Sequence, residues 1–168
     1  MSYDFTLTAI IHATPQAIYE TWLSSRGHTA MTGGKARQSA SPGASVMAWD
    51  SYIHGKNLEL KPGKRIVQSW RTSKFADDAP DSKITVTLTP VTSGTKLTLK
   101  HSSVPDGHTS YEQGGWQKSY FEPMQHYFAH KKRIKPHAVK KHVAKKSVKK
   151  KAAKKTSARR AAKKAKKK

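Results

Sequence analysis

The sequence predicts an α+β fold in which an antiparallel β-sheet is covered by a long C-terminal helix and followed by a disordered basic tail. Three observations predict it. Apolar and polar residues alternate over several short segments of the first hundred residues. Apolar residues then recur at helical spacing between about 115 and 130. The charge changes abruptly after residue 130.

The charge distribution divides the chain into a domain over 1–130 and a tail over 131–168. The 168 residues carry a formal net charge of +23. Residues 1–130 hold 13 basic and all 10 acidic residues, together with every Trp, Tyr, Phe and Met. A chain of this length can bury roughly two-thirds of its unfolded surface. Residues 131–168 hold 20 basic residues, no acid and no large apolar side chain except Ile134. Such a segment cannot offset the entropy of ordering, so we expect it to be disordered.

The N-terminal elements are a strand and a short helical region. Phe5, Leu7 and Ala9 alternate with threonines, which predicts a strand of about ten residues. The pair Thr14-Pro15 then supplies an N-cap hydroxyl and a proline at the first helical position. We expect Gly27 and the pair Gly33-Gly34 to end the helical region. Its apolar stripe consists of Ile18, Tyr19, Trp22 and Leu23.

A period of two between Arg37 and about Lys100 predicts an antiparallel meander. The first two strands should be joined near Asp50-Ser51. The later strands are separated by turns at 61–64, where Pro62 fixes φ and Gly63 tolerates a positive φ, and at 91–95. The alternating positions, strand by strand, are Val46 and Ala48; Tyr52, Leu58 and Leu60; Ile66, Gln68 and Trp70; Ile84, Val86 and Leu88; Leu97 and Leu99.

The last element is the only one large enough to cover the apolar face of this sheet. Pro123 should kink this helix or remove one of its backbone hydrogen bonds. Its apolar positions are Trp116, Tyr120, Met124, Tyr127 and Phe128.

Four segments of the chain form a recognisable pattern: AMTGGKA (30–36), GKNLELKPGKRIVQSWR (55–71), GTKLTLKHSSVPDG (94–107) and GWQKSYFEPMQHYF (115–128). They resemble the activator-of-heat-shock-protein-90-ATPase domain family of the START-like, or SRPBCC, superfamily, and the resemblance covers about residues 3–130. It implies the helix-grip fold, a curved antiparallel sheet wrapped around the long C-terminal helix, often with a cavity between them. It also implies a co-chaperone hypothesis, in which the domain stimulates the ATPase of a heat-shock protein 90 homologue.

The chain departs from the family in two turns and in its tail. The family often has Gly-Gly where this chain has Gly43-Ala44, and Asp-Gly where it has Asp50-Ser51. The basic tail is not part of the family pattern. The fold hosts lipid binders, co-chaperone modules and a few enzymes, so the resemblance predicts fold better than activity.

The sequence indicates a protein that is not an enzyme and has no cofactor or metal. His126 and His130 have the i, i+4 spacing of a zinc protease helix, but Tyr127 stands where that motif needs Glu. Asp77, Asp78 and Asp81 form an acidic loop with too few ordered oxygen ligands for calcium. There is no cysteine, so disulfides and thiolate sites are excluded.

A set of large side chains is expected at the interface between sheet and helix. Aromatic rings with a polar tip suit two roles there, plain core packing or the lining of a cavity for an apolar small molecule. Both alternatives remain open from sequence alone. The candidate cavity residues are Trp49, Tyr52, Trp70, Trp116, Tyr120 and Met124.

The tail repeats a small residue followed by two cations, and it resembles the C-terminal tails of linker histones and of bacterial lysine-rich nucleoid proteins. It has no aromatic residue to stack on bases, and lysine outnumbers arginine, so we expect non-specific contact with nucleic-acid phosphates. DNA is favoured over RNA as the partner, but the sequence leaves the choice between them open. An anionic membrane or other polyanion, and an inert solubilising tail, are the alternatives. The candidate nucleic-acid-binding residues are Lys140, Lys141, Lys145, Lys146, Lys149, Lys150, Lys151, Lys154, Lys155, Arg159, Arg160, Lys163, Lys164, Lys166, Lys167 and Lys168.

The sequence therefore favours a START-like binding protein that is held on nucleic acid by its tail, with the co-chaperone module as the alternative. We expect neither a secretory signal nor a membrane span. The expected location is cytoplasmic, associated with the nucleoid in a bacterium or nuclear in a eukaryote.

Overall fold

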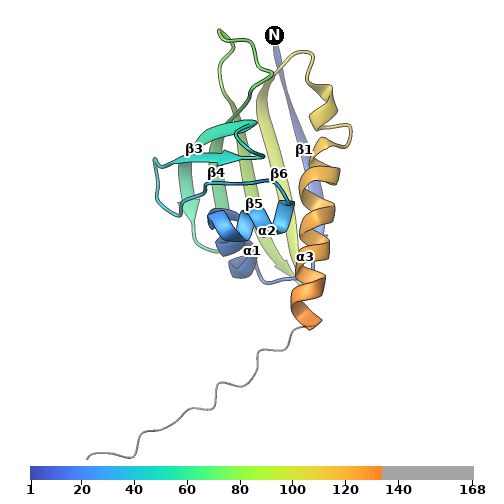
Figure 1. Cartoon of the computed structure of the whole chain (residues 1–168). Coiled ribbons are helices and arrows are strands. Elements are labelled where there is room, and N and C mark those ends of the chain that lie inside the picture. The colour runs from blue at the N-terminus through green and yellow to red at the C-terminus, as the bar shows by residue number, and fades with distance from the viewer. Residues whose placement is uncertain (134–168) are drawn as a thin grey trace, which may run out of the picture. The chain divides into compact units, whose positions relative to one another are not determined.

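The computed structural model describes residues 1–133 and confirms the α+β class. Eleven elements follow one another in this part of the chain (Figure 1). The predicted disorder of the tail lies outside the described residues. The elements are β1 (Ser2–Ile11), α1 (Pro15–Leu23), α2 (Ser25–Thr32), β2 (Ser45–Ala48), β3 (Ile53–Lys61), β4 (Arg65–Thr72), β5 (Ser82–Val91), β6 (Gly94–Pro105), the 3-10 helix η1 (Thr109–Tyr111), the π-helical turn η2 (Gln117–Phe121) and α3 (Glu122–Arg133).

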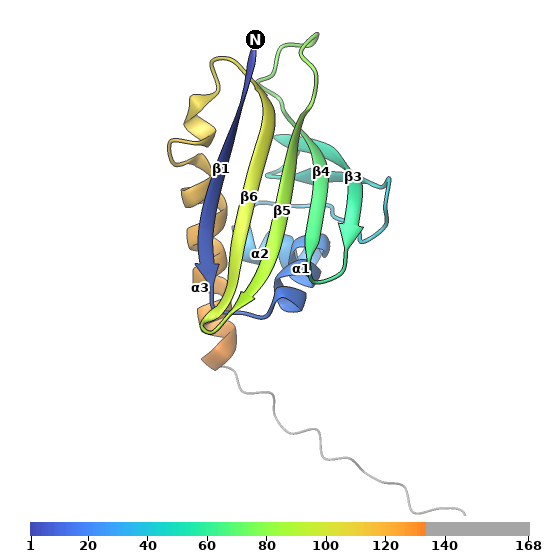
Figure 2. The same ribbon diagram turned by 180° about the vertical axis from the view of Figure 1, so that it is seen from behind.

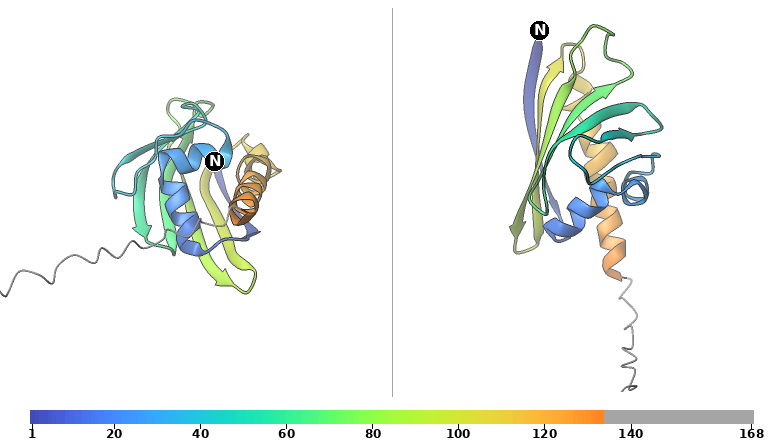
Figure 3. Two further views of the ribbon diagram at one scale, coloured as in Figure 1. Left: turned by 60° about the horizontal axis from the view of Figure 1, so that its bottom comes forward. Right: turned by 90° about the vertical axis from the view of Figure 1, so that its left-hand side faces the viewer.

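The described strands form one antiparallel sheet of six strands in the order β1-β6-β5-β4-β3-β2. The strands β2 to β6 are the predicted meander, and β1 pairs with β6 at the other edge. The sheet curls, and α1, α2 and α3 all lie on its concave side (Figures 2 and 3). This arrangement confirms the helix-grip architecture.

The N-terminal helices begin as predicted but are divided at a different residue. Thr14 Oγ1 accepts a hydrogen bond from the amide of Ala17, and Gly33 ends α2 with a φ of +85°. The expectation that Gly27 ends a helix is wrong, because Gly27 lies inside α2. The break is made by Ser24, whose Oγ caps α2 by accepting from the amide of Gly27. A Cβ at Gly27 would lie 2.8 Å from the carbonyl oxygen of Thr21, so this glycine permits the close passage of the two helices.

The alternation predicted in β3 is interrupted at one position. The register against β4 shifts between Asn57 and Glu59, so Asn57 is buried and Leu58 is 52% exposed. The prediction that Leu58 shares the apolar face with Leu60 is therefore wrong. A register irregularity of this kind reverses the facing of the residues beside it. The Asn57 amide is satisfied inside by the carbonyl oxygens of Ser39 and Ser41.

The irregularity predicted at Pro123 takes the form of a π-helical turn. The amide of Glu122 donates to the carbonyl of Gln117, five residues earlier, immediately before the proline. Pro123 has no amide to donate, and a widened turn at such a point is a common way of continuing the helix. The turn contains Tyr120 and Phe121, both buried.

Candidate functional site

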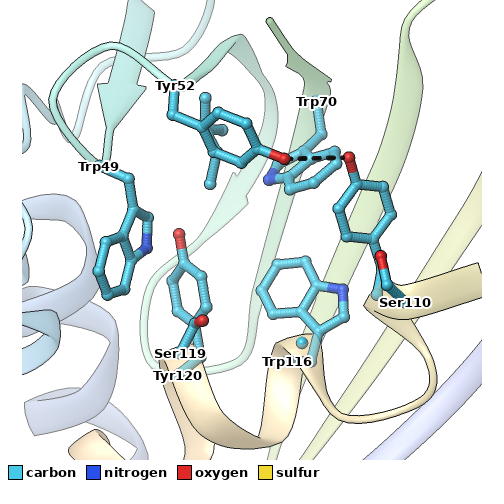
Figure 4. A pocket seen from close by; sticks show the side chains of 10 residues that line it. Trp49, Tyr52, Trp70, Ser110, Trp116, Ser119 and Tyr120 are labelled. Atoms are coloured by element: carbon cyan, nitrogen blue, oxygen red, sulfur yellow. Dashed lines mark hydrogen bonds between the residues drawn. The ribbon is translucent and has the colours of Figure 1, made fainter. Parts of the chain in front are cut away.

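A cavity of about 430 Å³ lies between the upper strands of the sheet and the segment that leads into α3. Its walls come from the β2–β3 loop, the start of β3, the end of β4, η1 and the first turns of the C-terminal helix (Figure 4). Ser110 is exposed at its rim, whereas Trp116 and Tyr120 are buried. The lining residues are Trp49, Tyr52, Ile53, Trp70, Ser110, Tyr111, Gly115, Trp116, Ser119 and Tyr120.

The structure brings five of the six predicted cavity residues together around this space. Met124 is the exception, since it is fully buried and is not among the described lining residues. Its place one helical turn after Tyr120 puts it in the core below the cavity, where it packs with the other apolar side chains. Sequence reasoning missed the η1 residues Ser110 and Tyr111, because this short segment has too few residues to show a hydrophobic period.

Trp49 is presented by a loop with an unusual backbone. Trp49, Asp50 and Ser51 have φ values of +54°, +54° and +75°, a region that costs a residue with a side chain about 1–2 kcal/mol. The loop is held by the amide of Asp50, which donates to the carbonyl of Lys35 at 3.1 Å. The indole rests on Gly34, where a Cβ would lie 2.7 Å from its Cε3 atom. Gly33 therefore ends α2, and Gly34 leaves the space that the Trp49 indole occupies in the cavity wall.

A buried hydrogen-bonded chain fixes the two opposite walls, Trp70 and Trp116. The Trp116 indole donates from Nε1 to His101 Nδ1 at 3.2 Å, so His101 must carry its proton on Nε2. That Nε2 donates to Ser82 Oγ at 2.9 Å, and Ser82 donates to the carbonyl of Trp70 at 2.6 Å. Burial lowers the pKa of His101 to about 3, partly opposed by the charge of Asp4. The histidine is therefore neutral and acts as a positioning residue.

Hydroxyl groups line the remaining side. Tyr111 shares hydrogen bonds with Thr72 Oγ1 at 2.9 Å and with the Tyr52 hydroxyl at 3.4 Å, the dashed line in Figure 4. Burial raises the pKa of Tyr111 and of Tyr120 well above the ordinary tyrosine value. Both phenols therefore stay protonated and can donate a hydrogen bond at neutral pH.

One donor at the cavity lacks an acceptor. Trp49 Nε1 is buried and has no hydrogen-bond partner among the described residues. Figure 4 shows it turned toward the Tyr120 hydroxyl. This contact partly opposes the rise in the pKa of Tyr120, but its geometry falls outside the limits of a hydrogen bond. None of the described lining residues is charged. The arrangement can bind a neutral molecule; no described lining residue is set up as an activated nucleophile.

The remaining expectations from the sequence concern metal ions, membrane spans and nucleic acid. Within residues 1–133 there is no group of three or more side chains that could hold a metal ion. No helix in this range is long and apolar enough to cross a membrane. The predicted nucleic-acid-binding side chains, all between Lys140 and Lys168, lie outside the described residues.

Comparison with protein families matches residues 12–129 to the family described as Activator of Hsp90 ATPase homolog 1-like protein. Among curated proteins, the human Activator of 90 kDa heat shock protein ATPase homolog 1 is 25% identical over 129 residues, which are 77% of this chain and 38% of that protein. The Dictyostelium discoideum homolog is 23% identical over 123 residues, 71% of this chain and 31% of its own length. This chain thus spans about a third of the length of the curated relatives that it matches.

Two solved structures share the fold over almost their whole length. An HSP90 activator from Plasmodium falciparum superposes with a TM-score of 0.69 at 19% identity, covering 76% of this chain and 96% of that one. A protein from Chromobacterium violaceum superposes with a TM-score of 0.60 at 25% identity, covering 75% and 97%.

Proposed function

Because the chain belongs to the Activator of Hsp90 ATPase homolog 1-like family, we propose that its folded domain is a co-chaperone module that stimulates the ATPase of an Hsp90 homologue. The observation that carries the proposal is the extent of the match, which runs from the end of β1 to within α3 and therefore includes nearly the whole domain. Two relatives that bear the activator name match over 77% and 71% of this chain, and an activator of known structure has the same fold. This reverses the order of the two sequence-based hypotheses.

The test is the ATPase rate of an Hsp90 homologue from the same organism, measured against increasing concentrations of the full chain. We expect a rate that rises severalfold and saturates, as for a specific complex. A peptide of residues 134–168 is the control, because its cations could act on an ATPase without any domain. Stimulation by the peptide alone, or none by a full chain shown to be folded by circular dichroism, would remove the proposal.

We further propose that the tail holds the protein on DNA by non-specific electrostatic attraction. The supporting observation is compositional: 20 cations and no acid over 131–168. If about half of them engage phosphates, the slope of log K against log salt is near −9 on duplex DNA. Affinity should then fall by roughly 10⁵ between about 50 and 200 mM salt.

The dependence of DNA affinity on salt also tests whether the tail is the part of the chain that binds DNA. Replacing five tail lysines with Gln should reduce the slope by up to about 4 or 5, wherever they lie. Shuffling the DNA sequence should leave affinity unchanged, because the contacts are to the backbone. Removing 134–168 should abolish DNA binding while ATPase stimulation persists. A slope near zero, or strong preference for one sequence, would contradict an electrostatic anchor.

A further inference from the structure

We propose that the cavity is a binding site for a neutral, flat ligand of two or three fused rings that carries a carbonyl oxygen, which accepts hydrogen bonds from Trp49 and Tyr120. The site goes beyond chaperone stimulation, and it can be tested without any chaperone. The size, the walls and the polar atoms of the cavity each define part of this ligand.

The size of the cavity sets the size of the ligand. A dry protein cavity of roughly 150 Å³ holds one benzene ring. The space here is about 430 Å³, close to three times as large. It also falls within the range of roughly 300–1,000 Å³ that is usual for small-molecule pockets. A molecule of two or three fused rings therefore fills it.

The walls favour an aromatic ligand without charge. Six of the ten described lining residues are Trp or Tyr, whose faces and edges offer stacking and edge-to-face contacts. These rings are packed on one another, with Trp116 and Tyr120 centroids 4.6 Å apart and Trp70 and Trp116 centroids 5.8 Å apart. No charged side chain lines the described walls, so an ionic group would lose its hydration without gaining a partner.

The polar atoms define where the ligand's oxygen lies. The N–H of Trp116 is already used by His101, and the Tyr111 hydroxyl is engaged by Thr72. The buried Nε1 of Trp49 has no acceptor within hydrogen-bond limits among the described residues, and a buried donor of this kind is destabilising until it is satisfied. The Tyr120 hydroxyl faces the same point (Figure 4). A carbonyl oxygen placed between these two groups satisfies both.

Two probes that differ only in the carbonyl test the proposal, fluorenone and fluorene. Binding to the full chain is followed by saturable quenching of tryptophan emission and checked by calorimetry. We expect fluorenone to bind about tenfold more tightly than fluorene, as for one well-placed hydrogen bond. Fluorenone-2-carboxylate should bind more weakly than fluorenone. That comparison is made at about 1 M salt, where a Debye length of about 3 Å suppresses attraction to the tail.

Three variants show which residues produce the preference for fluorenone over fluorene. Trp49→Phe keeps a ring but removes the N–H, and Tyr120→Phe removes the hydroxyl. Each should reduce the preference for fluorenone severalfold while leaving the affinity for fluorene unchanged. Tyr19→Phe is the matched control, because Tyr19 is also a buried tyrosine but does not line the cavity; it should leave both affinities unchanged.

Failure to bind either probe, equal affinity for both probes, or a carbonyl preference that survives Trp49→Phe would overturn the proposal. So would a carboxylate that binds as tightly as the ketone. Circular dichroism of each variant confirms that it is folded.

Discussion

Acidification from pH 7 to pH 5 should destabilise the domain steeply, because two histidines are buried in their neutral form. His101 is fully buried, and its Nδ1 must stay unprotonated to accept the Trp116 hydrogen bond. His28 is 1% exposed, donates from Nδ1 to the carbonyl of Trp22, and has an Nε2 without a partner among the described residues. Burial lowers the pKa of His101 to about 3 and also lowers the pKa of His28.

The sign and the magnitude follow from the proton balance. Below the unfolded pKa of about 6.5 the unfolded chain binds a proton on each of these histidines, whereas the folded domain does not. The free energy of unfolding therefore falls as pH falls, by about 1.9 kcal/mol for His101 between pH 7 and pH 5. The lowered pKa of His28 adds a loss of the same sign, and the His101 loss alone is a substantial fraction of the roughly 5–15 kcal/mol that is typical of a domain.

The carboxylates lose their contribution to stability below this pH range, so they do not account for a loss between pH 7 and pH 5. The pKa of Asp4 is lowered by the amide of Ser103 and by Lys100, and the pKa of Glu59 is lowered by Lys61 and Arg65. Both groups contribute stability that is lost only as the pH falls below the ordinary carboxyl range, about 4 to 4.5. A loss of stability above pH 5 is therefore attributable to histidine.

Urea unfolding followed by tryptophan fluorescence at about pH 7, 6 and 5 measures this loss. The variant His101→Gln retains a donor and an acceptor but cannot titrate. Its own loss between pH 7 and 5 should be smaller than that of the natural chain by about 1.9 kcal/mol, whatever its absolute stability. A natural chain that loses less than about 1 kcal/mol, or a variant with an unchanged loss, would refute the reasoning.

The turns provide further predictions. Ser51→Gly should stabilise the domain by about 1 kcal/mol, since φ is +75° there and glycine adopts it without strain; the urea midpoint should rise. Ala44→Gly, the other departure from the family, should lower that midpoint by about 0.5–1 kcal/mol of stability, because Ala44 does not have a positive φ and glycine only adds chain entropy. Gly55→Ala should lower the melting temperature by many degrees, because its Cβ would overlap the carbonyl oxygen of Ser69. An unchanged melting temperature would contradict the register of β3 on β4.

Much of the fold could be predicted from the sequence because it depends on local periodicity and turn chemistry. The alternation in β5 and β6, the cap at Thr14 and the turn at Gly63 all have their signal within a few residues, and the structure confirms each. The predictions for Leu58 and Gly27 are wrong because these two residues depend on contacts with other elements and not on the local sequence. The facing of Leu58 depends on the register of β3 against β4, and the role of Gly27 depends on how closely α1 passes α2.

The sequence by itself determined which large side chains face the concave side of the sheet, and it named five of the residues around the cavity. Only the tertiary structure decided that a space remains between them, since periodicity indicates which face is buried but not how completely facing side chains fill the volume. It also decided which polar atoms are free. Trp116 is satisfied by His101 from another strand, whereas Trp49 is left without an acceptor by a loop in a left-handed conformation. Hydrogen bonds between distant segments form only when the whole sheet has closed around the helix, so no local pattern encodes them.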